Sequence, residues 1–250
     1  MKDAEKKFPL DAELAYSKSL NKFIDEIEKK FKEIFLNKKN PRLKKNSEED
    51  LEDEFLSYFE QLITTEYATG LCLDYILEAV QYTVAGINSE ITSIVGVEFY
   101  QAFIDKDIIS KIVQDNVALI KAEPSKYLRT YDKVVEKLVK EKVEEGLTLK
   151  DLSEAIQKVT GIEKSRADLI AADQVGNVYS QVTKSQFEGI GLERFRWVTV
   201  GDKRVRPEHQ KRNLKIYLWA NPPDGEIPGG PIRCRCVAVA VKADVLKLLG

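Results

Sequence analysis

RFRWVTVGDKRVRPEHQKRNLKIYLWANPPDGEIPGGPIRCRCVAVAV, residues 194–241, is the stretch that sets this chain apart. Five of the eight prolines fall within it, together with the residue types that the rest of the chain nearly lacks. These are the only histidine, both tryptophans and two of the three cysteines: His209, Trp197, Trp219, Cys234 and Cys236. The crowding indicates that this segment has structural or chemical requirements that the remainder does not share.

The local pattern of this stretch predicts short strands separated by turns. Aromatic residues alternate with basic ones over residues 194–198, which is typical of a strand with one apolar side. Residues 214–219 and 233–241 predict two further strands, and Pro207 suits the first turn of a short helix. The last residues predict a short helix or an extension of the final strand. We therefore predict a small α+β module over residues 189–250.

Residues 1–188 predict a mainly α-helical N-terminal body. Apolar residues recur at helical spacing through most of this region. The predicted helices cover about residues 15–35, 51–63, 88–104, 107–121, 125–145, 149–158 and 163–188. Breaks are predicted at Gly70, Gly86 and Thr160-Gly161, and another within the basic segment 37–47. The two predicted domains are the helical body, 1–188, and the module, 189–250.

The bulk composition restricts the class of protein. A chain of 250 residues with 43% hydrophobic and 32% charged residues is ordinary for a globular protein. No apolar run approaches the length of a membrane span, and the N-terminus does not resemble a secretory signal. The odd cysteine count argues against a disulfide framework and fits a reducing cytoplasm, with Cys72 predicted as a buried apolar thiol. We expect no membrane partner.

Basic residues gather within the module although the whole chain is slightly acidic. The formal net charge is −2, but residues 194–235 hold ten basic and only four acidic residues. A local basic patch on an acidic body can contact nucleic acid or an acidic partner surface, or serve only as a solvated surface. The residues predicted to make such contacts are Arg194, Arg196, Lys203, Arg204, Arg206, Lys211, Arg212 and Lys215.

The two cysteines of the module are candidate metal ligands. Cys234 and Cys236 are two positions apart on a predicted strand, so both thiols face the same side. Together with His209 and Asp202 they offer the ligand types of a zinc site, which would make the module a zinc-stabilised interaction unit. The alternative is structural: two small buried residues on a strand, and a histidine that makes ordinary hydrogen bonds.

The same segment also holds the residue types of an acyl-transfer or nuclease site. His209 can act as a base that Asp202 orients, and Arg204 or Arg206 can stabilise an oxyanion or a phosphate. A nuclease- or toxin-like enzyme centred on Asp202–His209 is therefore an alternative function. The sequence shows these residue types but not their convergence in space, so no catalytic residue is assigned and a function without catalysis is favoured.

An ordered set of motifs spans about residues 160–242: Ala172-Asp173-Gln174, Arg196-Trp197-Val198-Thr199, the run DKRVRPEH over 202–209, Tyr217, Trp219, Pro222-Pro223, Pro228-Gly229 and Cys234-Arg235-Cys236. In this order the motifs resemble those of the phage Mu F-type head morphogenesis family, the minor capsid proteins of tailed phages and prophages. Two departures are Ala172, where the family commonly has arginine, and Asn213-Leu214, where it commonly has an Asp-Gly turn. Trp197, Trp219, Pro222 and Pro223 are interpreted as a structural signature.

The resemblance implies a minor head protein that acts in head morphogenesis. Its implied partners are the portal protein and the major capsid or scaffold protein, and phage DNA during packaging or ejection. Its implied location is the host cytoplasm during assembly and then the virion, near the portal or inside the capsid. The resemblance also implies a helical N-terminal region that differs among members of the family.

Overall fold

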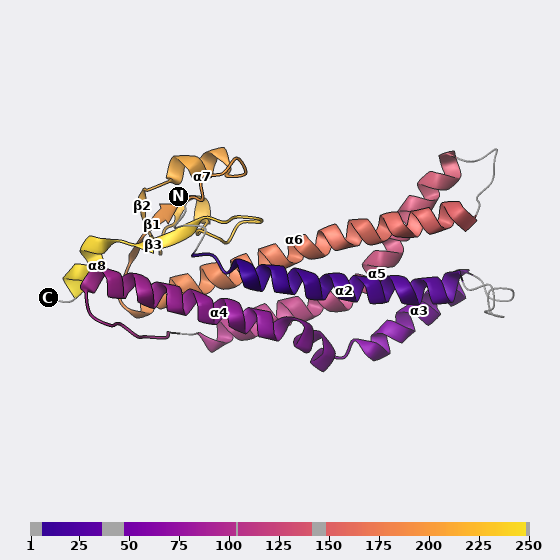
Figure 1. Ribbon diagram of the computed structural model, residues 1–250, viewed down its shortest axis with the longest axis horizontal. Helices are drawn as coiled ribbons and strands as arrows, with labels where there is room; N and C mark the ends of the chain where they lie inside the picture. Colours follow the sequence, from indigo (N-terminus) through magenta and orange to yellow (C-terminus); the bar gives the residue numbers. More distant parts are fainter. Residues whose placement is uncertain (1–6, 37–47, 104, 142–148, 249–250) are drawn as a thin grey trace. The chain divides into compact units, whose positions relative to one another are not determined.

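The computed structural model describes residues 7–36, 48–103, 105–141 and 149–248 (Figure 1). Five helices come first in this part of the chain: α2 (Leu10–Phe35), α3 (Glu48–Leu62), α4 (Thr65–Val95), α5 (Lys106–Glu141) and α6 (Leu149–Gly189). The elements that follow are β1 (Arg194–Val198), α7 (Pro207–Arg212), β2 (Ile216–Leu218), the 3-10 helix η2 (Pro223–Gly225), β3 (Val237–Ala240) and α8 (Lys242–Leu248). The predicted fold class, a mainly α body followed by a small α+β module, is confirmed.

Several helices are longer than predicted. α4 runs without a break through Gly70 and Gly86, and α6 runs through Thr160-Gly161, so the breaks predicted at these positions were wrong. Space around the three glycines is open, with no atom near the position of an added Cβ. A glycine costs an exposed helix interior about 1 kcal/mol, which packing of the opposite apolar face outweighs.

The helix predicted over 88–104 was wrong at its end. α4 stops at Val95, and Gly96 takes the left-handed conformation, φ 76°, that commonly terminates a helix. The predicted helices 107–121 and 125–145 are one helix, α5, which contains Pro124. Residues 142–145 and the break predicted within 37–47 lie outside the described residues.

The chain folds into two compact units. One, here called the helical unit, comprises Tyr16–Cys72 and Asp115–Leu169; the other, the sheet unit, comprises Met1–Ala15, Leu73–Gln114 and Ile170–Gly250. The predicted division at 188/189 into a helical body and a module stays a prediction.

Aromatic side chains fill the core of the helical unit. The Phe31 ring stacks on Phe35 at 4.3 Å between centroids and packs against Tyr131 at 4.5 Å. The buried Tyr16 hydroxyl in this core donates to Asn116 Oδ1 at 2.7 Å. Cys72 is buried here as predicted, and burial raises the pKa of its thiol to about 11.

The sheet unit is built on three antiparallel strands in the order β2-β1-β3. In the central strand, Phe195 pairs with Tyr217 of β2 and with Ala240 of β3, and Trp197 pairs with Ala238. Phe195 and Trp197 are fully buried, as their alternation predicted. The core beneath them includes residues from outside the strands, namely Ile87 and Ile91 of α4, Phe187 of α6, Trp219 and Val245.

Polar contacts join the sheet to the helices of the same unit. The backbone N–H of Ala240 donates to Glu90 of α4 at 2.7 Å, and Lys7 pairs with the other oxygen of that carboxylate. Arg235 donates to Glu13 at 3.1 Å. None of the described helices combines the length and the apolar character that crossing a bilayer requires.

Candidate metal centre

Helix α7 presents His209 to the interior. It begins at Pro207, whose fixed φ and missing N–H suit a helix start, directly after the extended Arg206. His209 and Arg212 are three residues apart and therefore share one face of the helix, and both are buried. The imidazole packs edge-on against the Trp197 ring, with 5.1 Å between centroids.

The cysteines lie in the extended segment that leads into β3 rather than in the strand itself. Cys234 and Cys236 are buried, and Arg235 between them points outward toward Glu13. Helix α6 sets the start of this segment, because Asp173 accepts the backbone N–H of Arg233 at 2.8 Å. Burial raises the pKa of the Asp173 carboxyl. Arg233 itself takes a left-handed conformation, φ 55°, which turns the chain just before Cys234.

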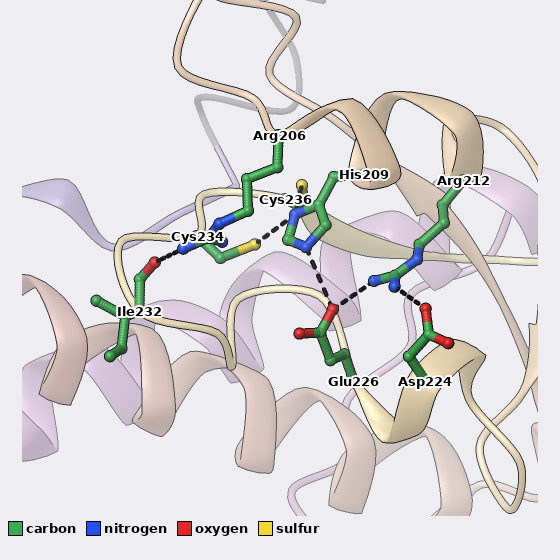
Figure 2. A network of polar contacts seen from close by, with 8 residues as sticks. All are labelled: Arg206, His209, Arg212, Asp224, Glu226, Ile232, Cys234 and Cys236. Atoms are coloured by element: carbon green, nitrogen blue, oxygen red, sulfur yellow. Dashed lines mark hydrogen bonds and ion pairs between the residues drawn. The ribbon is translucent and has the colours of Figure 1, made fainter.

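His209, Cys234 and Cys236 converge on one point (Figure 2). His209 Nδ1 is 3.6 Å from each of the two sulfur atoms, and the three candidate ligand atoms all lie within 4.8 Å of one another. None of the cysteines forms a disulfide. An imidazole and two thiols are the ligand types of zinc and other soft or borderline ions, so this buried group can bind a metal such as zinc.

The pKa values of the two thiols depend on each other. The hydrogen bond between them lowers the pKa of Cys234 and raises that of Cys236, whose burial raises it further. The Cys234 thiol is therefore easier to deprotonate than that of an isolated cysteine.

The other ring nitrogen of His209 faces a carboxylate. Glu226 Oε2 lies 3.3 Å from His209 Nε2 and accepts a hydrogen bond of 2.5 Å from Arg212 Nη1. This hydrogen bond lowers the pKa of Glu226, so the carboxylate stays ionised and acts only as an acceptor. Nε2 therefore acts as the donor to Glu226, and in the neutral imidazole the Nδ1 lone pair lies on the side of the sulfurs.

Arg212 supports this arrangement from within the fold (Figure 2). Its side chain is only 6% exposed and donates from Nη2 to Asp224 at 2.5 Å as well as to Glu226. Its guanidinium lies over the Trp197 ring, 5.0 Å from the centroid. Sequence reasoning missed Glu226 and Asp224; the available signal was a pair of acidic residues inside a loop otherwise dense in proline and glycine.

Asp202, the fourth predicted ligand and the predicted partner of His209, lies elsewhere. Its carboxylate accepts the backbone N–H of Arg204 at 2.9 Å and pairs with the Arg204 guanidinium at 2.7 Å. Glu226, rather than Asp202, is the acidic residue against His209. Arg206 donates to the Ile232 carbonyl at 2.6 Å and thereby braces the turn before Cys234.

Half of the basic residues predicted to contact nucleic acid bond to other residues of the chain, although only Arg212 among them is buried. Arg194 pairs with Asp244, Arg204 with Asp202, and Arg212 with Asp224 and Glu226, while Arg206 bonds a carbonyl. The remaining four form no ion pair with any described residue: Arg196, Lys203, Lys211 and Lys215. Three of these, the lysines, are exposed.

The four signature residues hold the loops around the centre. Trp197 and Trp219 are buried, and Trp219 packs against Phe195 with 4.1 Å between ring centroids. Pro222 and Pro223 lead into η2, where Asp224 takes a left-handed conformation, φ 55°. This turn places Asp224 and Glu226 beside Arg212.

Comparison with known proteins gives the same family as the motifs. A family model described as "Phage Mu protein F like protein" matches residues 133–239. An uncharacterized protein of Haemophilus influenzae is 33% identical over 134 residues. That alignment covers 53% of this chain but 29% of the relative, so the chain matches less than a third of that protein's length. No solved structure matches the chain. The resemblance carried by the ordered motifs is thus confirmed, because residues 133–239 match the model of this phage Mu protein F-like family.

Proposed function

We propose that this chain is a minor head protein of a tailed phage or prophage and acts in head morphogenesis. The observation that carries the proposal is the match of residues 133–239 to the phage Mu F-like family. The geometry supports it, because residues of the family motifs are packed together in one unit. Asp173 binds the segment of Cys234, Trp197 packs on His209, and the Pro222-Pro223 turn supplies the partners of Arg212.

The proposed setting is the portal region or the interior of the capsid. The chain would be made in the host cytoplasm, join the head during assembly with the portal and the major capsid or scaffold protein, and remain in the virion. The family resemblance supports these partners.

Mass spectrometry of purified particles tests this proposal. Particles of the phage or prophage that encodes the chain should contain it, and a deletion of its gene should reduce the yield of DNA-filled heads. Co-expression with the portal and capsid proteins of the same genome should yield a complex that survives size-exclusion chromatography. Its absence from mature particles, together with normal heads in the deletion strain, would refute the proposal.

Direct contact with packaged DNA is the finer part of the proposal. Exposed lysines without an ion pair support it, and the −2 net charge restricts it to weak, sequence-independent contact with phosphates. Replacing Lys203, Lys211 and Lys215 with glutamine should weaken binding to duplex DNA and lower its salt dependence. The slope should fall by about one unit for each phosphate that a lysine no longer neutralises.

The matched control removes three exposed lysines from α2 instead. Changing Lys18, Lys22 and Lys29 to glutamine alters the net charge by the same amount as the first triple variant. All three residues lie outside the family match. Equal DNA binding by the two triple variants at every salt concentration would count against a DNA contact through the module.

A further inference from the structure

We infer that His209, Cys234 and Cys236 bind one zinc ion, and that Glu226 is a positioning residue which orients His209 through its second ring nitrogen. The inference concerns the metal content of the chain and is separate from the head-protein proposal. Particles can contain the chain whether or not it holds zinc, so failure of one proposal leaves the other testable.

The distances match those of a tetrahedral zinc centre. With Zn–S of about 2.3 Å and Zn–N of about 2.0–2.1 Å, tetrahedral angles set a sulfur and a nitrogen ligand about 3.6 Å apart. His209 Nδ1 lies 3.6 Å from both Cys234 Sγ and Cys236 Sγ. Both nitrogen–sulfur separations are therefore those that a zinc ion bridges, and the two sulfur atoms lie within 4.8 Å of each other.

The hydrogen-bond pattern around His209 is the pattern that zinc-bound histidines show. A histidine that binds zinc through one nitrogen commonly donates from the other to a carboxylate, which fixes the tautomer and makes the ligating nitrogen more basic. Here Glu226 faces Nε2 at 3.3 Å, and Arg212 holds Glu226 at 2.5 Å. The metal-facing nitrogen is therefore Nδ1, on the side of the sulfurs.

Charge balance also favours a divalent ion. All three candidate ligands are at most 5% exposed, and an uncompensated buried charge is costly. Two thiolates and one zinc ion sum to zero formal charge, and Glu226 is balanced by Arg212. Zinc binding thus allows both thiols to ionise without leaving net charge in the interior.

The centre would tie two distant parts of the module together. His209 is on α7, whereas the cysteines lie 25 and 27 residues later, just before β3. Among the described residues, no fourth histidine, cysteine, aspartate or glutamate joins the group. The fourth position is left for water or another donor. The deep burial of the ligands assigns the ion to stabilisation of the loop that it closes.

Elemental analysis of the full chain, purified without chelator, tests the zinc site. We expect about one zinc per chain in the wild type, the content of a single site. Cys234→Ser and Cys236→Ser should lose the zinc, whereas Cys72→Ala, the matched control in the helical unit, should keep it. A metal-free wild type, iron or copper in place of zinc, or unchanged zinc in both serine variants would overturn the assignment.

A second measurement, on wild-type protein, tests the site if the serine variants fail to fold. Cobalt added to metal-free wild-type protein should produce thiolate-to-cobalt charge-transfer absorption, and zinc should displace it; no such absorption would overturn the site.

The zinc affinity of a Glu226 variant tests the role of this residue. Glu226→Gln should weaken zinc affinity about 10- to 100-fold in competition with a chromogenic chelator, while the zinc content at saturation stays that of the wild type. Glu208→Gln, on an exposed residue of the same helix as His209, is the control. Equal affinity of the Glu226 variant and the wild type would remove Glu226 from the centre.

Discussion

Arg212 is a buried cation that two acidic residues of one loop neutralise. Its planar guanidinium can donate to Asp224 and Glu226 at once and still lie over Trp197, which a lysine could not reproduce. The residue thereby links α7 to the proline-rich loop that follows β2.

Replacing Arg212 with methionine should destabilise the protein by about 1–3 kcal/mol, because two carboxylates are left without their partner. Both acids are partly exposed, so the cost should fall below that of a fully buried pair. Urea unfolding followed by tryptophan emission measures the change, with Lys211→Met on the exposed neighbour as control. Equal stability of the two variants would mean that the arginine contacts contribute nothing.

Asp244 makes a pH-dependent contribution. The hydrogen bond from Arg194 lowers the pKa of Asp244, so the folded state favours the ionised carboxyl. A depressed pKa in the folded state gives stability that is present above the unfolded pKa of about 3.9 and disappears as pH falls through the folded pKa. Asp244→Asn should therefore lower Tm at pH 7.

The difference in Tm between Asp244→Asn and the wild type should shrink to nothing in strong acid. Lys242→Gln, which removes a charge from the same helix without touching this pair, serves as the control. A Tm difference that stayed constant from neutral to strongly acid pH would show that ionisation of Asp244 is not its source.

The sequence anticipated the ligand types of the centre but not the residues that support them. His209, Cys234 and Cys236 could be grouped because few side chains bind soft ions, and the two-residue spacing put both thiols on one side. Glu226 could not be found in this way, since its approach to His209 depends on the left-handed turn at Asp224. Asp202 was grouped by type alone, yet its short turn brings it to Arg204 instead.

α6 illustrates how tertiary contact decides the effect of a glycine. Gly161 and Gly176 lie in the same helix, but only Gly176 meets a neighbour: an added Cβ would come within 2.8 Å of the Gly229 carbonyl oxygen. The loop that precedes the cysteines therefore depends on a bare backbone at Gly176.

Two alanine substitutions in α6 should have opposite effects. Gly161→Ala should stabilise the chain by about 0.5–1 kcal/mol, because alanine favours the helix and the site is open. Gly176→Ala should destabilise it by about 1–3 kcal/mol, because backbone atoms must move apart. Thermal unfolding of both variants gives the comparison, and stabilisation by Gly176→Ala would contradict the close contact.

The strand over residues 194–198 was easier to predict than the extent of the helices. Alternation over residues 194–198 follows from burial of one face only, so buried aromatic residues recur at every second position of the sequence. Whether α4 and α6 continue through a glycine depends instead on how their apolar faces are packed. A single glycine on an open face gives no information about that packing. For this reason the breaks at Gly70 and Gly86 were predicted and are not present.

The sheet unit is assembled from three separate stretches of the chain. Ile87 and Ile91 of α4 and Phe187 of α6 belong to the same core as Phe195 and Trp219. Residues 189–250 therefore do not contain their own complete core, even though the sequence marks them as a distinct module.

A fragment of residues 189–250 made alone should fail to fold, because the apolar surface that covers the sheet is missing. Near-ultraviolet circular dichroism and tryptophan emission measure this: the fragment should show solvent-exposed indoles, and the full chain buried ones. Cooperative unfolding of the isolated fragment from a state with buried tryptophans would show that the module is self-sufficient.

The placement of the two tryptophans gives the protein a built-in optical probe. Both indoles lie in the sheet unit, and the sequence of the helical unit contains none. Emission excited at the red edge of indole absorption therefore reports on the sheet unit alone, whereas far-ultraviolet dichroism is dominated by the long helices. Melting one sample with both signals would show, without any label, whether the sheet unit unfolds at the same temperature as the helices of the chain as a whole.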